Sequence, residues 1–240
     1  MYRRLNAQRI ADTVERLCRR IEERFPGSGL SYVSRELLEV SRQHEVEIEK
    51  ILRPNWLVRI GVGITIVALV LVVAGAALSV KVSMSFDRIT DLLQGLDAAV
   101  NEIILLAVAL FFLVSLEGRF KRRHTLRALH QLRSIAHVID MHQLTKDPDA
   151  ASPQFQTPSS PQRLLTPFEM SRYLDYCSEM LALVTKLAAL HAQYLRDPVV
   201  LGAVNDVEEL AAGLSQKIWQ KIVMLGTKTP RGAAPEMTEG

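Results

Sequence analysis

The stretch IGVGITIVALVLVVAGAALSV, residues 60–80, runs for twenty-one residues without a charged side chain. As a helix that rises about 1.5 Å per residue, it matches the hydrocarbon core of a bilayer, which is about 30 Å thick. A second apolar run, residues 98–116, follows after a short polar connection at residues 81–97. The sequence therefore predicts an all-α protein in which residues 57–116 form a two-span transmembrane hairpin.

The second apolar run is shorter than the first. Its strictly uncharged part, residues 103–116, has fourteen residues, a length that also fits a buried or re-entrant segment. Counting from residue 98 restores the length but admits Asn101 and Glu102. An acid at the outer interface is ordinary, whereas an acid inside a span lines a polar path. Both interpretations of Glu102 stay open.

Cationic side chains flank the two runs unequally. Four precede the first run, six follow the second and two lie in the connection: Arg42, Lys50, Arg53 and Arg59, then Arg119, Lys121, Arg122, Arg123, Arg127 and Arg133, then Lys81 and Arg88. Lys and Arg near span ends are retained on the cytoplasmic side of a membrane. We therefore expect a multi-pass protein of the cell (inner) membrane with both termini in the cytoplasm.

Five of these cations form a compact group that we name the basic cluster: Arg119, Lys121, Arg122, Arg123 and Arg127. Positive charge just inside a membrane follows from topology alone. It also attracts the headgroups of anionic lipids, so the basic cluster predicts contact with membrane lipid.

Small residues repeat along one side of the first run. This side holds Gly61, Thr65, Ala68, Gly75 and Ser79, with Val72 between them. Small side chains let helices approach closely in lipid, where packing drives their association. The side packs either on the second span of the same chain or on another copy. A ring of copies would place Glu102 at the mouth of a pore.

Outside the hairpin, apolar residues recur at spacings of three and four, which is typical of amphipathic helices. The spacings predict a helical hairpin over residues 1–56, a juxtamembrane helix over residues 117–145 and a second helical hairpin over residues 168–226. Pro and polar residues dominate two further segments, which predict a flexible linker at 146–167 and a disordered tail at 227–240.

Three apolar stripes predict the core of a cytoplasmic antiparallel bundle built from both ends of the chain. They consist of Ile10, Val14, Leu17 and Ile21; of Leu129, Leu132, Ala136 and Ile139; and of Val204, Val207, Ala211, Leu214, Ile218, Ile222 and Leu225. The third stripe has the spacing of a coiled-coil seam, which favours a homo-oligomer or a helical protein partner. Replacing Leu214 and Ile218 with Asp is then expected to disrupt that assembly.

Overall composition limits the function classes. Hydrophobic residues make up 48% and charged residues 23%, which fits a globular domain joined to a membrane anchor. The net charge of +3 is too small to favour nucleic acid as a partner. Two cysteines, Cys18 and Cys177, have no metal-ligand spacing and are interpreted as reduced thiols.

Four titratable side chains, His130, Arg133, His137 and Asp140, occupy successive turns of one helix face. We name them the titratable row. His130, His137 and Asp140 are candidate metal ligands, although Arg133 between them would repel a cation. Alternatively, the row pairs with acids of the following helix, such as Asp175 or Glu179, or it is a solvated face.

His191 differs because it lies in the middle of an apolar helix face. A single histidine at such a position is typically a core residue that is satisfied by a neighbouring polar group, and the alternative is a pH sensor.

The sequence contains no P-loop, GxGxxG, GxSxG or HExxH motif, so it predicts no catalytic residues and no cofactor, and it resembles no family. We expect a non-enzymatic, membrane-anchored helical interaction or scaffold protein. The alternatives are an oligomeric ion channel or transport pore and a membrane-tethered, metal-dependent hydrolase.

Overall fold

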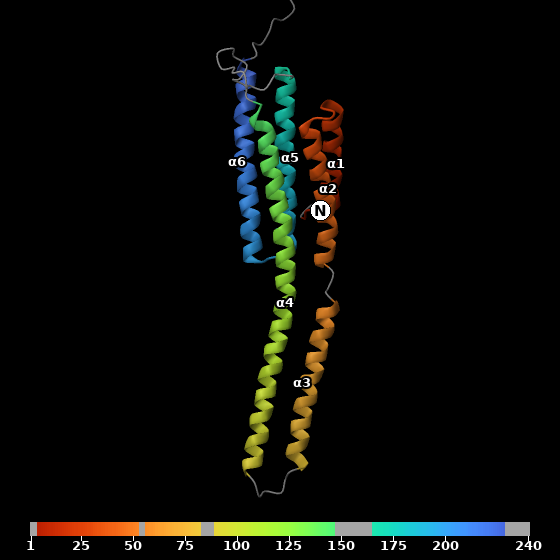
Figure 1. The fold of residues 1–240 in the computed structure, drawn as a ribbon, viewed down its shortest axis with the longest axis vertical. Coiled ribbons are helices and arrows are strands. Elements are labelled where there is room, and N and C mark those ends of the chain that lie inside the picture. The colour runs from red at the N-terminus through yellow and green to blue at the C-terminus, as the bar shows by residue number, and fades with distance from the viewer. Residues whose placement is uncertain (1–3, 53–55, 83–88, 147–164, 229–240) are drawn as a thin grey trace, which may run out of the picture. The chain divides into compact units, whose positions relative to one another are not determined.

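The computed structural model describes residues 4–52, 56–82, 89–146 and 165–228. These residues form six α-helices and no strand, so the all-α prediction is confirmed (Figure 1). The helices are α1 (Ala7–Arg24), α2 (Gly29–Leu52), α3 (Trp56–Val82), α4 (Ile89–Leu144), α5 (Pro167–Tyr194) and α6 (Pro198–Lys228).

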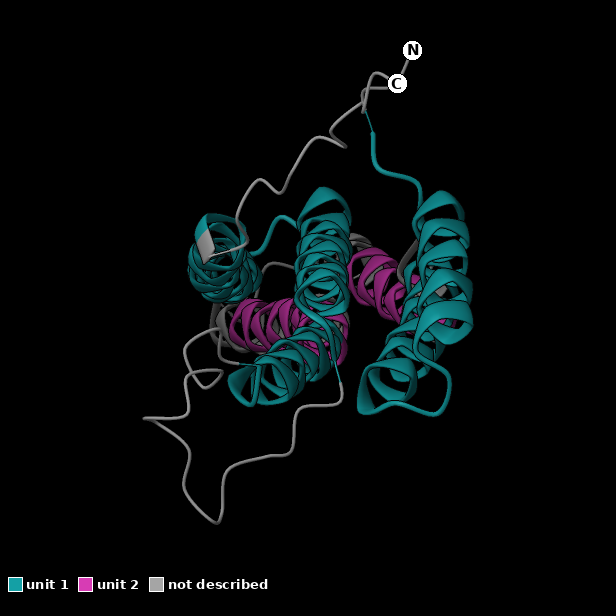
Figure 2. Ribbon diagram, turned by 90° about the horizontal axis from the view of Figure 1, so that it is seen from above, with its two compact units in different colours: residues 1–50, 125–240 teal, residues 51–124 magenta. Residues whose placement is uncertain are grey.

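The chain divides into two compact units, coloured separately in Figure 2. Unit 1 consists of residues 1–50 and 125–240, and unit 2 consists of residues 51–124. Unit 1 is therefore built from two halves that unit 2 separates in the sequence. The predicted bundle built from both ends of the chain corresponds to unit 1.

Helix α5 supplies the largest part of the core of unit 1. Thirteen of its residues are buried, and they are spread over more than one side of the helix. Helix α5 packs against α1 of the N-terminal half and against α6 of the C-terminal half. Its broad apolar arc explains this position, because a helix that is apolar over most of its circumference must be covered on several sides.

The three predicted stripes point into this core. All their members are buried except Ile222, which is partly buried against the core: Ile10, Val14, Leu17 and Ile21; Leu129, Leu132, Ala136 and Ile139; Val204, Val207, Ala211, Leu214, Ile218 and Leu225. The third stripe lies on α6, which packs on α5 of the same chain. Its coiled-coil spacing is thus used inside unit 1 and no longer argues for a second chain.

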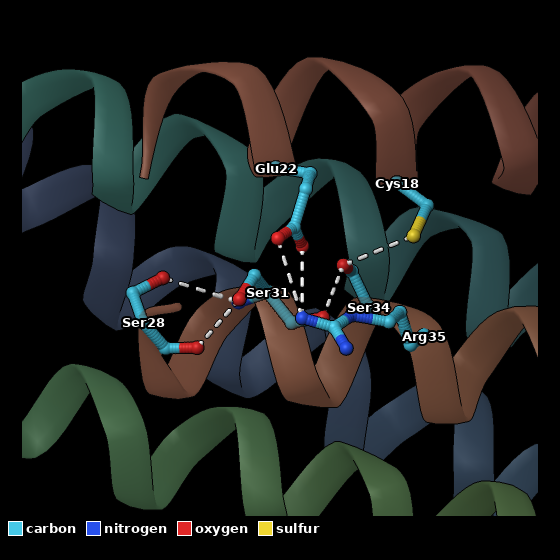
Figure 3. A network of polar contacts seen from close by, with 6 residues as sticks. All are labelled: Cys18, Glu22, Ser28, Ser31, Ser34 and Arg35. Carbon is cyan, nitrogen blue, oxygen red and sulfur yellow. Dashed lines mark hydrogen bonds and ion pairs between the residues drawn. The ribbon is translucent and has the colours of Figure 1, made fainter. Parts of the chain in front are cut away.

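A polar network fixes the turn between α1 and α2 (Figure 3). The backbone N–H of Ser31 donates to Oγ of Ser28 at 3.2 Å, and Oγ of Ser31 donates to the carbonyl of Ser28 at 2.8 Å. Oγ of Ser34 lies 3.4 Å from Sγ of Cys18, and Arg35 pairs with Glu22 at 3.1 Å. These contacts satisfy the first backbone groups of α2 and hold the two helices of the hairpin together.

Several helix ends differ from the predicted boundaries. Helix α5 already begins at Pro167, because Thr166 and Glu169 form a capping box, and α6 continues past Gly226 to Lys228. Residues 227 and 228, which the prediction assigned to the tail, are therefore helical. Residues 147–164 of the predicted linker and the remainder of the tail, 229–240, lie outside the described residues.

Helix also occupies part of the predicted connection at 81–97. Helix α3 continues to Val82, and α4 begins at Ile89 and runs for 56 residues. No proline interrupts this stretch, and a single helical glycine costs only about 1 kcal/mol, so Gly118 does not end the helix. The predicted juxtamembrane helix at 117–145 is the C-terminal part of α4.

Candidate functional site

Large apolar side chains are exposed along both helices of unit 2. On α3 they are Trp56, Ile60, Ile64, Ile66, Val67, Val70, Leu71 and Val73; on α4 they are Leu96, Val100, Ile103, Ile104, Leu105, Val108, Phe111, Phe112 and Phe120. Their exposed fractions range from 40% for Ile103 to 76% for Phe111. Among the residues that the structure describes, no helix has the combined length and apolar character needed to cross a membrane.

The small-residue side of α3 is only partly covered. Gly61, Thr65 and Ala68 are half-buried, and Oγ1 of Thr65 donates to the carbonyl of Gly61 at 3.0 Å. Gly75 is exposed, and the side chain of Ser79 lies outside the described residues. The first turns of the small-residue side are thus less exposed to solvent than the large apolar side chains around them.

The other membrane-related residues lie on α4. Glu102 is exposed. Within the basic cluster, Arg119, Arg123 and Arg127 are exposed and the other two members are half-buried. The exposed guanidinium groups are accessible to an anionic headgroup.

The titratable row does not form a metal site in the described part of the chain. His130 and His137 are exposed, and Asp140 accepts a hydrogen bond from Nε2 of Gln143 at 2.6 Å. No group of three or more His, Cys, Asp or Glu side chains among the described residues could hold a metal ion. The hydrolase hypothesis therefore gains no support from these residues.

The acids expected to pair with the titratable row have other partners. Asp175 pairs with Arg172 of its own helix at 3.0 Å, and Glu179 pairs with Arg20 of α1. Arg133 instead lines a hollow of about 420 Å³ that is bordered mainly by α6, whose contributions include two acids, Asp206 and Glu209. The ion pairs of Asp175 and Glu179 are thus made with arginines outside the row, and an ion-pair network of the row with such acids stays a prediction.

His191 is a core histidine with a polar neighbour. Its Nε2 lies 3.1 Å from Nδ1 of His44, which belongs to α2. The two rings are close to perpendicular, with an interplanar angle of 76° and centroids 4.8 Å apart. His44 is 0% exposed and His191 is 1% exposed. The sequence places His44 on the apolar stripe of its helix but does not reveal its partner, which is 147 residues away.

Burial changes the chemistry of His44. It lowers the pKa of the imidazole to about 3, and the positive charge that His191 can carry acts in the same direction. The imidazole of His44 is then neutral near pH 7, and the donor and acceptor roles of the two facing nitrogens depend on the tautomers.

Further contacts join the N-terminal half of unit 1 to α5. The backbone N–H of Leu5 donates to Oε1 of Gln193 at 2.9 Å, and Nε2 of Gln193 donates to the carbonyl of Leu5 at 3.2 Å. At the other end of α5, the ring of Phe25 makes edge contacts with Tyr173 and Tyr176, with centroids 5.5 and 6.2 Å apart. The two halves are thus joined along the length of α5.

Cys177 lies in the same core and is not a nucleophile. It is completely buried, and burial raises the pKa of its thiol to about 12 against the opposing effect of Lys221 and Lys146. The thiol therefore stays protonated at neutral pH. It is unreactive in this form, because only a thiolate is a nucleophile.

No family model, curated protein or solved structure matches this chain. Two features of the described residues bear on function: the exposed apolar surface of unit 2 and the polar contacts that join the halves of unit 1.

Proposed function

We propose that this chain is a membrane-anchored helical scaffold, in which residues 57–116 cross the bilayer twice and unit 1 is a bundle in the cytoplasm. The observation that carries the proposal is the exposed apolar surface of α3 and α4. Contiguous exposed apolar surface of this kind is rare on monomers in water and typically marks a contact with lipid or protein.

The length of the apolar runs favours lipid over protein. The uncharged run of α3 extends to residue 80, and the side chains described within it are those of residues 60–75. A charged residue in the middle of a span costs about 2.5–3.5 kcal/mol, and this run contains none over twenty-one residues. Surface helices of globular proteins keep a polar side, which residues 60–80 lack.

The distribution of charge supports the orientation and the lipid contact. Cations concentrate before residue 60 and after residue 118, the two ends that the proposal places in the cytoplasm. The exposed arginines of the basic cluster would then meet anionic headgroups, each contributing about 1 kcal/mol near the surface.

A scaffold role is supported by the surface of unit 1. Trp219 and Val223 are one turn apart on α6 and are 64% and 46% exposed. Tryptophan is enriched in protein interfaces, so a second copy or another helical protein remains the proposed partner. The pore hypothesis keeps only the sequence arguments from Glu102 and the small-residue side of α3.

Two matched valine substitutions test the anchor. Val70 of α3 is 60% exposed and Val223 of α6 is 46% exposed, so both tolerate a lysine sterically. We expect the wild type and Val223→Lys to stay in the membrane pellet after alkaline carbonate extraction, and Val70→Lys to shift toward the supernatant or to be degraded. A reporter fused after residue 240 is expected on the cytoplasmic side.

Extraction of the wild type by carbonate, or an external reporter, would refute the anchor. The protein mass of the solubilised complex, with bound detergent subtracted, decides the partner class. Twice 26.9 kDa or a higher multiple indicates copies of this chain, and a protein mass that is no multiple indicates a different protein.

A further inference from the structure

The two halves of unit 1 meet at a contact between two buried imidazoles. His44 belongs to α2, before unit 2, and His191 belongs to α5, after it. Their facing nitrogens are 3.1 Å apart and both side chains are almost completely removed from solvent. A hydrogen bond between two neutral imidazoles needs one N–H donor and one bare nitrogen, so it fails when both facing nitrogens carry protons.

We propose that the His44–His191 contact is an acid-sensitive latch, which holds the α1–α2 hairpin on α5 while both imidazoles are neutral and releases it when the pair takes up protons. This inference does not rest on the membrane anchor, because both histidines lie in unit 1.

Apolar residues flank both histidines along their own helices. On α5, the neighbours of His191 at the preceding turn are the buried Leu187 and Ala188, and Leu190 precedes it. On α2, the residues one turn either side of His44 are the buried Val40 and Ile48.

Charged residues lie near the pair in sequence, on α2 and on α5. Glu47 lies one turn along α2 from His44, with a buried carboxylate oxygen, and it has an interaction of its own. On α5 the closest cation in sequence is the exposed Lys186, which donates to the carbonyl of Ala182. On α1, which also packs on α5, the buried residues are apolar apart from the thiol of Cys18.

The direction of the effect follows from linkage. The pKa of His44 is lowered from 6.5 to about 3 in the folded protein, first by burial and second by His191. A hairpin that has left α5 exposes the imidazole, whose pKa then returns toward 6.5. Protons therefore bind preferentially to the open state, and the free energy that favours the closed state decreases as the pH falls from 6.5 toward 3.

Other contacts between the halves respond less over the upper part of this range. The hydrogen bonds between Leu5 and Gln193 involve no titratable group. The phenyl ring of Phe25, which contacts Tyr173, has none either. The Arg20–Glu179 pair is lost only when the carboxylate is protonated, and carboxylates ordinarily titrate near 4.3. Among these contacts, the histidine pair is therefore the one that we expect to change between pH 7.5 and 5.5. His142 of α4 also borders α2, at Gly29.

Hydrogen exchange of the full chain in one detergent tests the latch. For one histidine that titrates near 6.5 only in the open state, the opening constant rises about tenfold between pH 7.5 and 5.5. We expect this increase, after correction for intrinsic exchange rates, in the amides of α1 and α2. We expect no comparable change in α6, which contains neither histidine.

Two variants complete the test. His44→Leu combined with His191→Leu removes both polar partners, so α1 and α2 are expected to keep equal protection at both pH values. His137→Gln, which removes an exposed histidine of the same unit, is expected to behave as the wild type. If the double variant does not fold, the comparison of α2 with α6 in the wild type decides. A wild type without the increase, an equal increase in α6, or a double variant that keeps the pH dependence overturns the latch.

Discussion

At position 29 the missing side chain lets α2 begin against the ring of His142 on α4. A Cβ atom at this position would lie 2.7 Å from Nδ1 of His142 and closer still to Cε1. Both distances are below van der Waals contact, so the two helices approach one another through the glycine. The sequence predicts only a turn here, because the pattern of one helix does not show which residue of another will face it.

Gly29→Ala forces the half-buried ring of His142 to move and should destabilise unit 1 by about 1 kcal/mol, the low end of the cost of an additional methyl group in a packed contact. Gly213→Ala is the matched control, because a Cβ there has nothing within 4 Å. This control should gain roughly 0.5–1 kcal/mol, the helix preference of alanine over glycine. Thermal unfolding followed by circular dichroism measures both changes, and equal midpoints for the two variants would contradict the close approach.

At the scale of single helices, each helix of unit 1 is set by its own signals. The spacing of Val14 and Leu17 on α1 and of Leu132 and Ala136 on α4 identifies the buried face, and those positions are buried. Helix ends are harder to predict from the sequence. The polar composition of residues 89–97 indicates a connection, whereas their helix propensity permits the helix that the structure has there. Buried polar pairs such as His44 and His191 are invisible, since nothing local links residues on two helices.

The capping box of α5 gives a prediction for one helix. The backbone N–H of Glu169 donates to Oγ1 of Thr166 at 3.2 Å, and the backbone N–H and hydroxyl of Thr166 donate to Oε2 of Glu169 at 2.8 and 2.9 Å. Thr166→Ala should cost about 1 kcal/mol. The hydrogen bonds hold the pKa of Glu169 below its usual value, so the cap's contribution is present at neutral pH and is lost as the pH falls through that pKa.

Thr185→Ala is the control for this change. Thr185 lies inside α5, where Oγ1 donates to the carbonyl of Ala182 at 2.9 Å and caps no helix end. Its replacement should alter the free energy of unfolding by less than about 0.5 kcal/mol. Urea unfolding of the two variants separates them, and a loss in Thr185→Ala as large as that in Thr166→Ala would exclude a capping effect.

At the scale of the whole molecule, the two units have separate internal contacts. The apolar stripe of α6 is used within unit 1, whereas the apolar side chains of α3 and α4 in unit 2 are exposed. The sequence predicts the stripe of α6 as a buried face, and its members are buried or partly buried, whereas membrane contact of the α3 and α4 side chains stays a prediction. The coiled-coil spacing alone does not tell whether a second chain or the neighbouring helix α5 covers the stripe. Helix α5 directly precedes α6 in the chain, and the two helices pack on each other.

Ile218→Asp should unfold unit 1 and leave unit 2 unaffected. Ile218 is completely buried, and an unpaired carboxylate in the core costs several kcal/mol, so Cys177 should become reactive toward a maleimide. Trp219→Asp changes the next residue, which is 64% exposed, and should leave Cys177 protected. Peptide mass spectrometry identifies the labelled thiol. Labelling of Cys177 in both variants or in neither would contradict the core position, and carbonate extraction of Ile218→Asp should match that of the wild type.

The separation of unit 1 into two halves also fixes the order in which a ribosome supplies its parts. Roughly a hundred residues separate the end of α2 from the start of α5, which take about 5–20 seconds to synthesise. During that interval the nascent α1–α2 hairpin has made its own turn contacts but has no α5 to cover its apolar stripes. Chains that terminate before α5 therefore leave the apolar stripes of α1 and α2 uncovered for chaperones and proteases, whereas finished chains bury them.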